Sequence, residues 1–254
     1  MVIVNSHSLV SEDHMKPMDS GNRVAVVTGA TSGIGLAVAR ELRQLGMRLV
    51  LTGRSAERLS RTCAELGAEM VVADIADPTV PELLLRTALE RFQRCDVVIN
   101  NAGAIEVGPI ATIDIDKVCG MVRVNVEAAY RVAYTFIRHF AKENHGHVIN
   151  MSSVMGTKVR PTAGAYAGTK FAIEALSEAL RIEVAGTGVS VTCIEPGIVA
   201  TELHRDWPVH PTVGMNIPHP LLPEDVARCV SFVLAQPPHV RIPRLMILPG
   251  EHQI

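Results

Sequence analysis

Short apolar runs alternate with amphipathic segments along most of this chain. RVAVVTG at residues 23–29 and DVVINNAG at 96–103 have the length and the β-branched composition of buried strands. Between them, residues 36–46 and 55–67 carry apolar side chains at helical spacing, and Ser55 is placed to cap the second helix. Strands that are apolar throughout need cover on both faces. The pattern therefore predicts an α/β fold, a doubly wound parallel sheet with helices on both faces.

The same alternation continues into the second half of the chain. Further strands are expected within HVINMSS and VSVTCIEPG, and longer helices at about 114–122, 124–143 and 165–186. No linker rich in Pro, Gly or Ser interrupts the pattern, so we expect one domain over 22–254. Residues 1–21 show no sustained period and are predicted to form a flexible tail.

The composition narrows the classes of function. The chain has 254 residues, 48% of them hydrophobic, and a net charge of −2. No run approaches the ~20 apolar residues of a membrane span, no Lys/Arg cluster offers a footprint for nucleic acid, and MVIV is too short for a secretory signal. The five cysteines lack CxxC spacing and are interpreted as reduced core thiols. We expect a cytoplasmic protein without membrane or nucleic-acid partners.

A glycine-rich turn follows the first predicted strand. TGATSGIG, Thr28 to Gly35, places Gly29, Gly33 and Gly35 between that strand and an amphipathic helix. Glycines allow a tight turn, and the free N–H groups at the helix start can bind a pyrophosphate. Glycines alone would also suit a structural turn, and the GxxxGxG spacing differs from the commoner GxGxxG fingerprint. Their position between a strand and a helix favours dinucleotide binding.

Tyr166 and Lys170 stand four residues apart at the start of an apolar helical segment, so they share one helix face. A free phenol holds its proton to about pH 10. A nearby ammonium would stabilise the phenolate and bring the phenol's pKa closer to neutrality, where acid–base catalysis is more efficient. A surface tyrosine beside a solvated lysine is the alternative for this pair taken alone.

Five motifs in order resemble the short-chain dehydrogenase/reductase family, in its single-domain branch. They are TGATSGIG, NNAG at 100–103, the serine of NMSS, YAGTK and PGIVAT. The resemblance runs from about Arg23 to Thr201 and is weaker beyond. It implies a Rossmann-type fold and an oxidoreductase that transfers a hydride between a nicotinamide cofactor and a carbonyl/alcohol pair. In such enzymes the cofactor carries the hydride and the protein orients it.

The resemblance also implies roles for four residues. Tyr166 would be the general acid/base at the substrate oxygen, while Lys170 would lower the phenol's pKa and hold the nicotinamide ribose. Ser153, thirteen residues before the tyrosine, matches the serine that orients the substrate. Asn125 matches the asparagine that anchors a proton-relay water to the lysine.

Further positions match the family's cofactor site. Asp74 and Ile75 would contact the adenine, and residues 101–103 would form the floor under the adenosine ribose. Residues 196–201 would hold the nicotinamide carboxamide. The full set implied by the resemblance is Gly29, Thr31, Ser32, Gly33, Ile34, Gly35, Arg54, Ser55, Asp74, Ile75, Asn101, Ala102, Gly103, Tyr166, Lys170, Pro196, Gly197, Ile198 and Thr201.

The end of the second strand favours NADP(H) over NAD(H). Gly53 stands where NAD-dependent relatives carry an acidic residue for the ribose 2′-hydroxyl, and Arg54 follows it. A carboxylate would repel a 2′-phosphate, whereas a guanidinium can bind it with two hydrogen bonds. A solvated Arg54 near a helix start is the alternative. Ser32 adds no support, because some NADP-dependent relatives carry a basic residue there.

Residues 202–222 are expected to form a lid over the substrate. Trp207 and Met215 would either pack the lid against the core or line an apolar pocket, and both possibilities stay open. No metal is expected, because the spacing of six and nine residues between the lid histidines suits no standard ligand pair; these are His204, His210 and His219. A polar or charged substrate group would lie near three residues at the family's pocket mouth: Met155, Arg160 and Glu106.

The last predicted strand reads RLMILPG in place of the family's common VDGG-like ending. With CIEPG and TEL, it is similar to a smaller NADPH-using branch that includes clavulanic aldehyde reductase and the NADPH-binding blue fluorescent proteins. That similarity implies reduction of an aldehyde or ketone. Two alternatives remain, a non-redox dehydratase or isomerase on the same scaffold and a nucleotide-binding regulator without turnover.

A homotetramer or homodimer is implied by the resemblance, since the helices around 124–143 and 165–186 match those that pair subunits in the family. Exposed alanines on these helices would allow close approach: Ala128, Ala129, Ala133, Ala172, Ala175 and Ala179. The same alanines would equally suit packing against the sheet.

Overall fold

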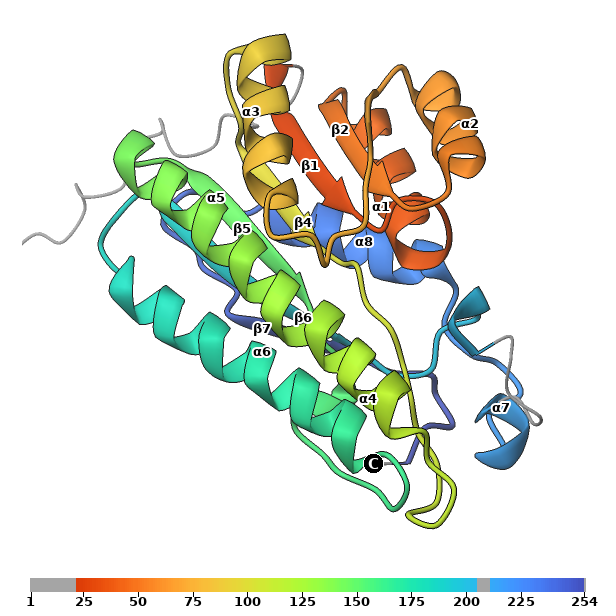
Figure 1. Cartoon of the computed structure of the whole chain (residues 1–254). Coiled ribbons are helices and arrows are strands. Elements are labelled where there is room, and N and C mark those ends of the chain that lie inside the picture. Colours follow the sequence, from red (N-terminus) through yellow and green to blue (C-terminus); the bar gives the residue numbers. More distant parts are fainter. Residues whose placement is uncertain (1–21, 205–210, 254) are drawn as a thin grey trace, which may run out of the picture.

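Parallel strands form one central sheet in the order β3-β2-β1-β4-β5-β6-β7 (Figure 1). The computed structural model describes residues 22–204 and 211–253. The strands are β1 (Val24–Thr28), β2 (Arg48–Gly53), β3 (Glu69–Val72), β4 (Val97–Asn100), β5 (Gly146–Met151), β6 (Val189–Pro196) and β7 (Arg244–Ile247). The order reverses between β1 and β4, which opens a crevice for a ligand at the carboxyl ends of the strands. The predicted Rossmann-type, doubly wound sheet is confirmed.

The connections between the strands are mostly helical, as the sequence predicts. The helices are α1 (Gly33–Gln44), α2 (Ala56–Leu66), α3 (Val80–Phe92), α4 (Ile115–Val122), the π-helical η3 (Arg123–Ala128), α5 (Ala129–Glu143), the 3₁₀ turn η4 (Val154–Gly156), α6 (Gly164–Glu183), η5 (Glu202–His204), α7 (Pro211–Gly214) and α8 (Pro223–Leu234). Ser55 caps α2 as expected, because its Oγ accepts the Arg58 N–H at 3.4 Å.

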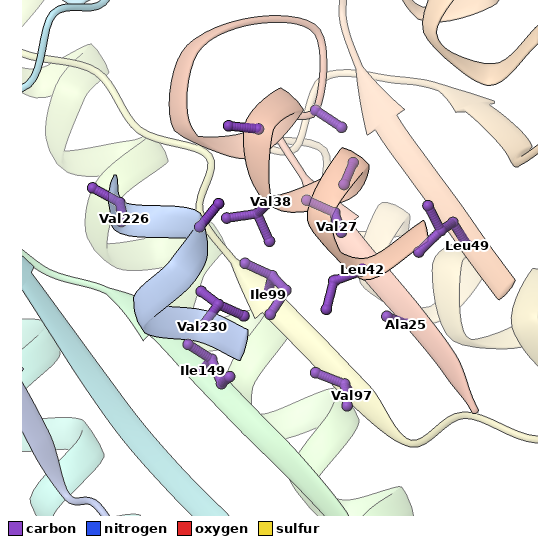
Figure 2. Packing of buried hydrophobic residues seen from close by; sticks show 14 of the residues in the cluster. Ala25, Val27, Val38, Leu42, Leu49, Val97, Ile99, Ile149, Val226 and Val230 are labelled. Carbon is purple, nitrogen blue, oxygen red and sulfur yellow. The ribbon is translucent and has the colours of Figure 1, made fainter. Parts of the chain in front are cut away.

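The strands alternate their side chains between two buried layers. Ala25 and Val27 of β1 face α1, α2 and α8, where Leu42 of α1 and Val230 of α8 join the same cluster (Figure 2). Their neighbours in β1 point the other way, toward α3, α5 and α6, which lie on the opposite face of the sheet (Figure 1). Burying a large apolar side chain contributes about 1.5–3 kcal/mol. Both faces of the sheet are therefore held by core packing, and the carboxyl ends of the strands are free to carry the site.

Two groups of small residues lie differently from the sequence-based expectation. Ala128, Ala129 and Ala133 are buried by this chain's own core, because their helix face is turned toward the sheet. Of the two possibilities that the sequence left open, packing against the sheet holds for these three and the exposed face does not, whereas Ala175 and Ala179 of α6 are exposed. The cysteines are unpaired, but Cys119 is exposed and therefore is not a core thiol.

Some predictions concern residues outside the described part of the chain. The tail at 1–21 and the lid residues Trp207 and His210 belong to this group. Within residues 22–204 and 211–253, no helix is both long enough and apolar enough to cross a membrane.

At the amino ends of the strands, a carboxylate joins β1, β4 and the start of β5. Asp96 has a side chain that is 1% exposed, and it accepts the Val24 N–H at 2.7 Å. Arg94 donates two hydrogen bonds to it at 2.9 and 2.6 Å, and His145 Nε2 donates a fourth at 3.0 Å. Burial alone would raise the pKa of Asp96, but the hydrogen bonds from His145, Arg94 and Val24 outweigh it and hold the pKa below its usual range.

Candidate active site

The glycine loop after β1 is locked against the segment that follows β4. Gly29 has a φ of +68°, a conformation that favours glycine. A Cβ added to Gly35 would lie 2.3 Å from the Gly29 carbonyl oxygen. The Asn101 side-chain amide donates to the Thr28 carbonyl at 2.9 Å, and the Thr28 hydroxyl accepts the Asn101 N–H at 3.0 Å. The loop is thus held in one shape, with the first turn of α1 behind it.

The end of β2 lies close to this loop. A Cβ added to Gly53 would lie 2.5 Å from Thr31 Cγ2, so a larger residue at position 53 would displace the loop side chain. Arg54, the next residue, is exposed. At the end of β3, Asp74 accepts the Ala76 N–H at 3.0 Å and is exposed beside the crevice.

A cavity of about 950 Å³ opens beside the glycine loop, between α1, α2 and the segment after β6. Thr31, Ser32, Gly33 and Thr201 line one part of it. Arginines from α1 and α2 line another part, and one of them, Arg58, pairs with Glu202 at 2.7 Å. Polar backbone, hydroxyl groups and cations in one cavity suit a phosphate-bearing ligand.

Three of the predicted catalytic residues gather at the carboxyl end of β5 and the start of α6. Ser153, Tyr166 and Lys170 are each less than a tenth exposed, at 8, 9 and 7%. Lys170 Nζ lies 5.8 Å from the centre of the Tyr166 ring and donates to the Met151 carbonyl at 2.8 Å. The spacing of four residues on α6 therefore does bring the ammonium and the phenol to one place, as the sequence indicates.

Asn125 reaches the same place from the π-helical turn η3. Its amide donates to the Ala104 carbonyl at 2.8 Å and its Oδ1 accepts the Ala104 N–H at 2.8 Å. It also donates to Thr169 Oγ1 at 3.2 Å, and Thr169 donates in turn to the Tyr166 carbonyl at 2.7 Å. Single π-turns occur often at functional sites. Here the turn ties the segment after β4 to the tyrosine's helix.

The segment after β6 closes the site. Gly197 donates its N–H to the Ile247 carbonyl at 2.8 Å, and a Cβ on Gly197 would lie 2.6 Å from His252 Nδ1. Two residues on, Val199 pairs with Leu221 in an isolated bridge. The predicted cofactor residues lie in three places. Most are at or just beyond the carboxyl ends of β1, β2, β3, β4 and β6, Gly33 to Gly35 form the first turn of α1, and Tyr166 and Lys170 are on α6.

Known proteins resemble this chain in sequence and in fold. The sequence model described as short chain dehydrogenase matches residues 23–210. The chain belongs to the short-chain dehydrogenase family. An uncharacterized oxidoreductase of Staphylococcus epidermidis is 34% identical over 229 residues, which cover 89% of this chain and 97% of the relative.

Solved structures resemble this short-chain dehydrogenase over nearly its whole length. The closed form of a serine dehydrogenase complexed with NADP+ has a TM-score of 0.85 and 29% identity, covering 91% of this chain and 96% of the neighbour. A 3-ketoacyl-(acyl-carrier-protein) reductase from Brucella melitensis complexed with NADH has a TM-score of 0.82 and 26% identity, covering 91% and 99%. This chain is an oxidoreductase of the short-chain type.

The charges around the tyrosine differ from the sequence-based picture. Burial raises the pKa of Tyr166, and a hydrogen bond with Ser153 and the positive charge of Arg160 partly offset that rise. Arg160 is thus a second cation near the phenol, one whose effect on this pKa the sequence did not indicate, and the role of Lys170 stays a prediction. Burial lowers the pKa of Lys170 to about 8, against a smaller opposing effect of Cys193 and Glu174.

Several residues of this short-chain dehydrogenase lie at the site without having been assigned a role from sequence. Arg244 of β7 holds Glu174 at 3.2 Å and Glu195 at 2.7 Å. Helical spacing would have found Glu174, which lies one turn beyond Lys170 on α6. Arg244 and His252 come from the far end of the chain, where no local pattern links them to the tyrosine.

The pocket-mouth and lid residues are partly described. Met155 donates its N–H to Ser153 Oγ at 3.1 Å, and the Glu106 N–H lies 3.1 Å from Met121 Sδ. His219 pairs with Glu251 at 2.9 Å. In the part of the chain that the structure describes, no group of three or more His, Cys, Asp or Glu side chains could hold a metal ion.

Proposed function

We propose that this short-chain dehydrogenase is an NADP(H)-dependent oxidoreductase that reduces an aldehyde or ketone, or oxidises the matching alcohol, with Tyr166 as general acid/base. The observation that carries the proposal is the convergence of Ser153, Tyr166 and Lys170 within one buried place at the carboxyl end of β5 and the start of α6. Asn125 supports that place through the Ala104 and Thr169 hydrogen bonds. A buried phenol, a buried ammonium and a hydroxyl at the ligand crevice form an acid–base site.

Each residue has a distinct task in the proposed reaction. The bound cofactor supplies or accepts the hydride at the substrate carbon. Tyr166 donates its hydroxyl proton to the carbonyl oxygen in reduction and takes it back in oxidation. Ser153 holds that oxygen with a second hydrogen bond. Lys170, with a pKa lowered to about 8, keeps its charge near neutral pH and steadies the phenolate left after proton transfer.

The choice of NADP(H) rests on the residues at the end of β2. The neighbours named above include one complexed with NADP+ and one complexed with NADH, so they support both cofactors. Gly53 cannot become an acidic residue without displacing Thr31. Arg54 is exposed beside the crevice, where its guanidinium can bind a 2′-phosphate. These two positions favour NADP(H).

The wider proposal is one domain over 22–254 with residues 202–222 as the substrate lid, in a cytoplasmic homotetramer or homodimer. The unpaired cysteines suit a reducing compartment. On α6, Phe171 is 43% exposed beside Ala175 and Ala179. An exposed aromatic next to small residues suits contact with a second subunit. Light scattering after gel filtration measures the mass, and a monomer at micromolar concentration would contradict the assembly.

The first test is the affinity of the protein for NADPH and for NADH, measured by calorimetry. We expect tighter binding of NADPH, and we expect Arg54→Ala to remove about tenfold of that advantage while NADH binding stays unchanged. Arg86→Ala, which removes an exposed arginine of α3 outside the cavity beside the glycine loop, is the control. A preference for NADH in the unaltered protein would overturn the choice of cofactor.

The second test concerns the tyrosine. Tyr166→Phe should lower turnover of aldehydes or ketones, followed at 340 nm, by about 10²–10⁴-fold, because the general acid is removed. NADPH should still bind. Tyr134→Phe, at an exposed tyrosine of α5, is the matched control and should leave turnover unchanged. Product formed without a change in absorbance at 340 nm would favour the dehydratase or isomerase alternative. Binding of NADPH without any turnover would favour the nucleotide-binding regulator.

A further inference from the structure

Arg160 is a cation at the reaction centre that the proposed proton and hydride steps do not use. It lies in the loop between η4 and α6, six residues before Tyr166, and is partly buried. Its positive charge acts on the Tyr166 phenol and lowers the pKa of that phenol. Burial lowers the pKa of His252, whose ring packs against Gly197, and the charge of Arg160 lowers that pKa further. The guanidinium is therefore near both the tyrosine and the segment after β6.

The hydrogen bonds of Arg160 are incomplete. Its Nη1 donates to Met215 Sδ at 3.1 Å, and a thioether sulfur is a weak acceptor. Its Nε is buried, and no described residue accepts a hydrogen bond from it. Among residues 22–204 and 211–253, no carboxylate forms an ion pair with Arg160. Leaving a buried charged donor unsatisfied is costly, so at the mouth of a ligand site such a donor is available to a ligand.

The loop that carries Arg160 is fixed. Thr162 has a φ of +67°, a strained conformation for a β-branched residue. Its carbonyl accepts the Gly108 N–H at 2.9 Å, and the Arg160 carbonyl accepts the Ala163 N–H at 3.3 Å. Backbone strain of this kind persists where the surroundings enforce it, often at ligand sites. The loop thus fixes the backbone that carries Arg160 just before the start of α6.

We propose that Arg160 binds a carboxylate of the substrate, so that this oxidoreductase acts on oxo acids and the corresponding hydroxy acids. The inference rests on the proposed function, because it places the carbonyl oxygen at Tyr166 and Ser153. A carboxylate would accept from Nε–H and a neighbouring N–H in the paired geometry that guanidinium favours. Two anchor points, one at each end of a short substrate, fix the carbonyl for proton transfer. A neutral ketone leaves the Arg160 donors unpaired and is disfavoured for that reason.

The test compares each oxo acid with its own methyl ester, which has the same carbonyl without the charge. Suitable pairs are acetoacetate and methyl acetoacetate, 4-oxobutanoate and methyl 4-oxobutanoate, and 4-oxopentanoate and its methyl ester. The full chain with NADPH should show a kcat/KM for at least one acid that is about tenfold or more above that for its ester. (2-Oxopropyl)phosphonate serves as a third arm, to separate a phosphate-like anion from a carboxylate.

The arginine variants are judged by the acid-to-ester ratio within each protein. Arg160→Gln also removes a charge that acts on Tyr166, and this effect lowers acid and ester turnover alike, so the ratio cancels it. We expect Arg160→Gln to bring the ratio close to one and Arg160→Lys to restore part of it. Lys158→Gln, at an exposed cation of the same loop, is the control and should keep the ratio of the unaltered protein.

Equal use of acid and ester by the unaltered protein would overturn the inference, as would an Arg160→Gln variant that keeps the full ratio. A phosphonate used better than every carboxylate would overturn the choice of carboxylate. If no oxo acid is turned over, the inference also fails. The proposed function is judged by a separate result. If the unaltered protein reduces neutral aldehydes and ketones and Tyr166→Phe does not, the proposed function is supported even though the inference about Arg160 fails.

Discussion

At the amino ends of the strands, the buried carboxylate of Asp96 accepts four hydrogen bonds, from Val24, Arg94 and His145. At the carboxyl ends, the buried ammonium of Lys170 has one described hydrogen-bond acceptor, the Met151 carbonyl, and the buried Nε of Arg160 has none. Asp96 is therefore satisfied by groups of this chain, whereas the described contacts of Lys170 and Arg160 are incomplete. The contrast is between these side chains and not between whole sheet ends, because Arg23 Nε and Arg48 Nε at the amino end are also buried without a described partner. Asp96 stabilises the fold, and Arg160 is the group that we propose to bind a ligand.

The pKa shifts of Asp96 and Lys170 have opposite meanings for stability. The fold holds the pKa of Asp96 below its usual range, so it favours the ionised carboxylate. Burial lowers the pKa of Lys170 to about 8, so the fold disfavours the charged ammonium. A shift that favours the ordinary charge state adds to the free energy of unfolding, and one that opposes it subtracts. Three substitutions test whether this contrast holds.

The largest effect is expected for Asp96→Asn. The amide removes the negative charge and turns an N–H₂ toward the donors of Val24, Arg94 and His145, so the free energy of unfolding should fall by about 3–5 kcal/mol at pH 7. Urea unfolding measures this loss. Because the folded pKa of Asp96 is depressed, its contribution is present above the unfolded value of about 3.9 and is lost as the pH falls further. The difference between the two proteins should therefore shrink below about pH 4.

A control for this prediction is Glu143→Gln, at an exposed carboxylate in the last turn of α5. Its effect should stay within about 0.5 kcal/mol. If the Asp96→Asn protein is as stable as the unaltered chain at pH 7, the four hydrogen bonds to Asp96 do not stabilise the fold, and the contrast with Lys170 fails.

Lys170→Met should have a smaller effect of the opposite sign. Replacing a buried, incompletely paired ammonium by an apolar side chain of similar length should raise the free energy of unfolding by about 1–3 kcal/mol at pH 7, while turnover is lost. The folded pKa is about 8 and the unfolded value about 10.4. Between these values the unfolded state binds more protons, so the unaltered protein gains stability as the pH rises.

The advantage of the methionine should therefore shrink between about pH 8 and pH 10, which urea unfolding at pH 7 and pH 9.5 measures. A Lys170→Met protein that is less stable than the unaltered chain at pH 7 would show that Lys170 is satisfied in the same way as Asp96.

The smallest effect is expected for His145→Gln. The His145 side chain is 52% exposed, and a glutamine amide can still donate to Asp96, so the loss should be about 1 kcal/mol or less. For a chain of this size that lowers Tm by about 2–4 °C, within reach of thermal unfolding by circular dichroism. A drop in Tm as large as that of Asp96→Asn would place the stabilising interaction in the imidazole rather than in the carboxylate.

The features that the sequence predicted correctly depend on the spacing of residues that are close along the chain. Apolar runs located the strands, Ser55 marked a helix start, and four residues between Tyr166 and Lys170 placed both on one face of α6. Each of these depends on neighbours along the chain. The helical period also identified an alanine face on α5, but it could not tell whether that face met another subunit or this chain's own sheet, and Ala133 proved to be buried.

The contacts that the sequence could not predict join segments that are far apart along the chain. Arg160 was placed near the pocket mouth, yet its effect on Tyr166 and its contact with Met215 depend on how the loop before α6 folds back toward the lid. His252 meets Gly197 from 55 positions further along the chain. The bonds of His145 to Asp96 likewise span 49 positions. Periodicity carries no information over such separations.

The π-helical turn η3 has a consequence for how this chain can change in length. A π-turn holds one residue more than an α-helical turn, and each residue turns an α-helix by about 100°. Because that extra residue fits within about one full turn, deleting one residue within Arg123–Ala128 would restore a regular helix and leave α5 nearly in phase, with Phe136 and Phe140 still on the sheet. A deletion within Ala129–Glu143 itself would instead rotate the rest of α5 by about 100° and carry these side chains off the sheet. The π-turn is therefore the place in this helical segment where the loss of one residue should spare the aromatic core and change only the local position of Asn125.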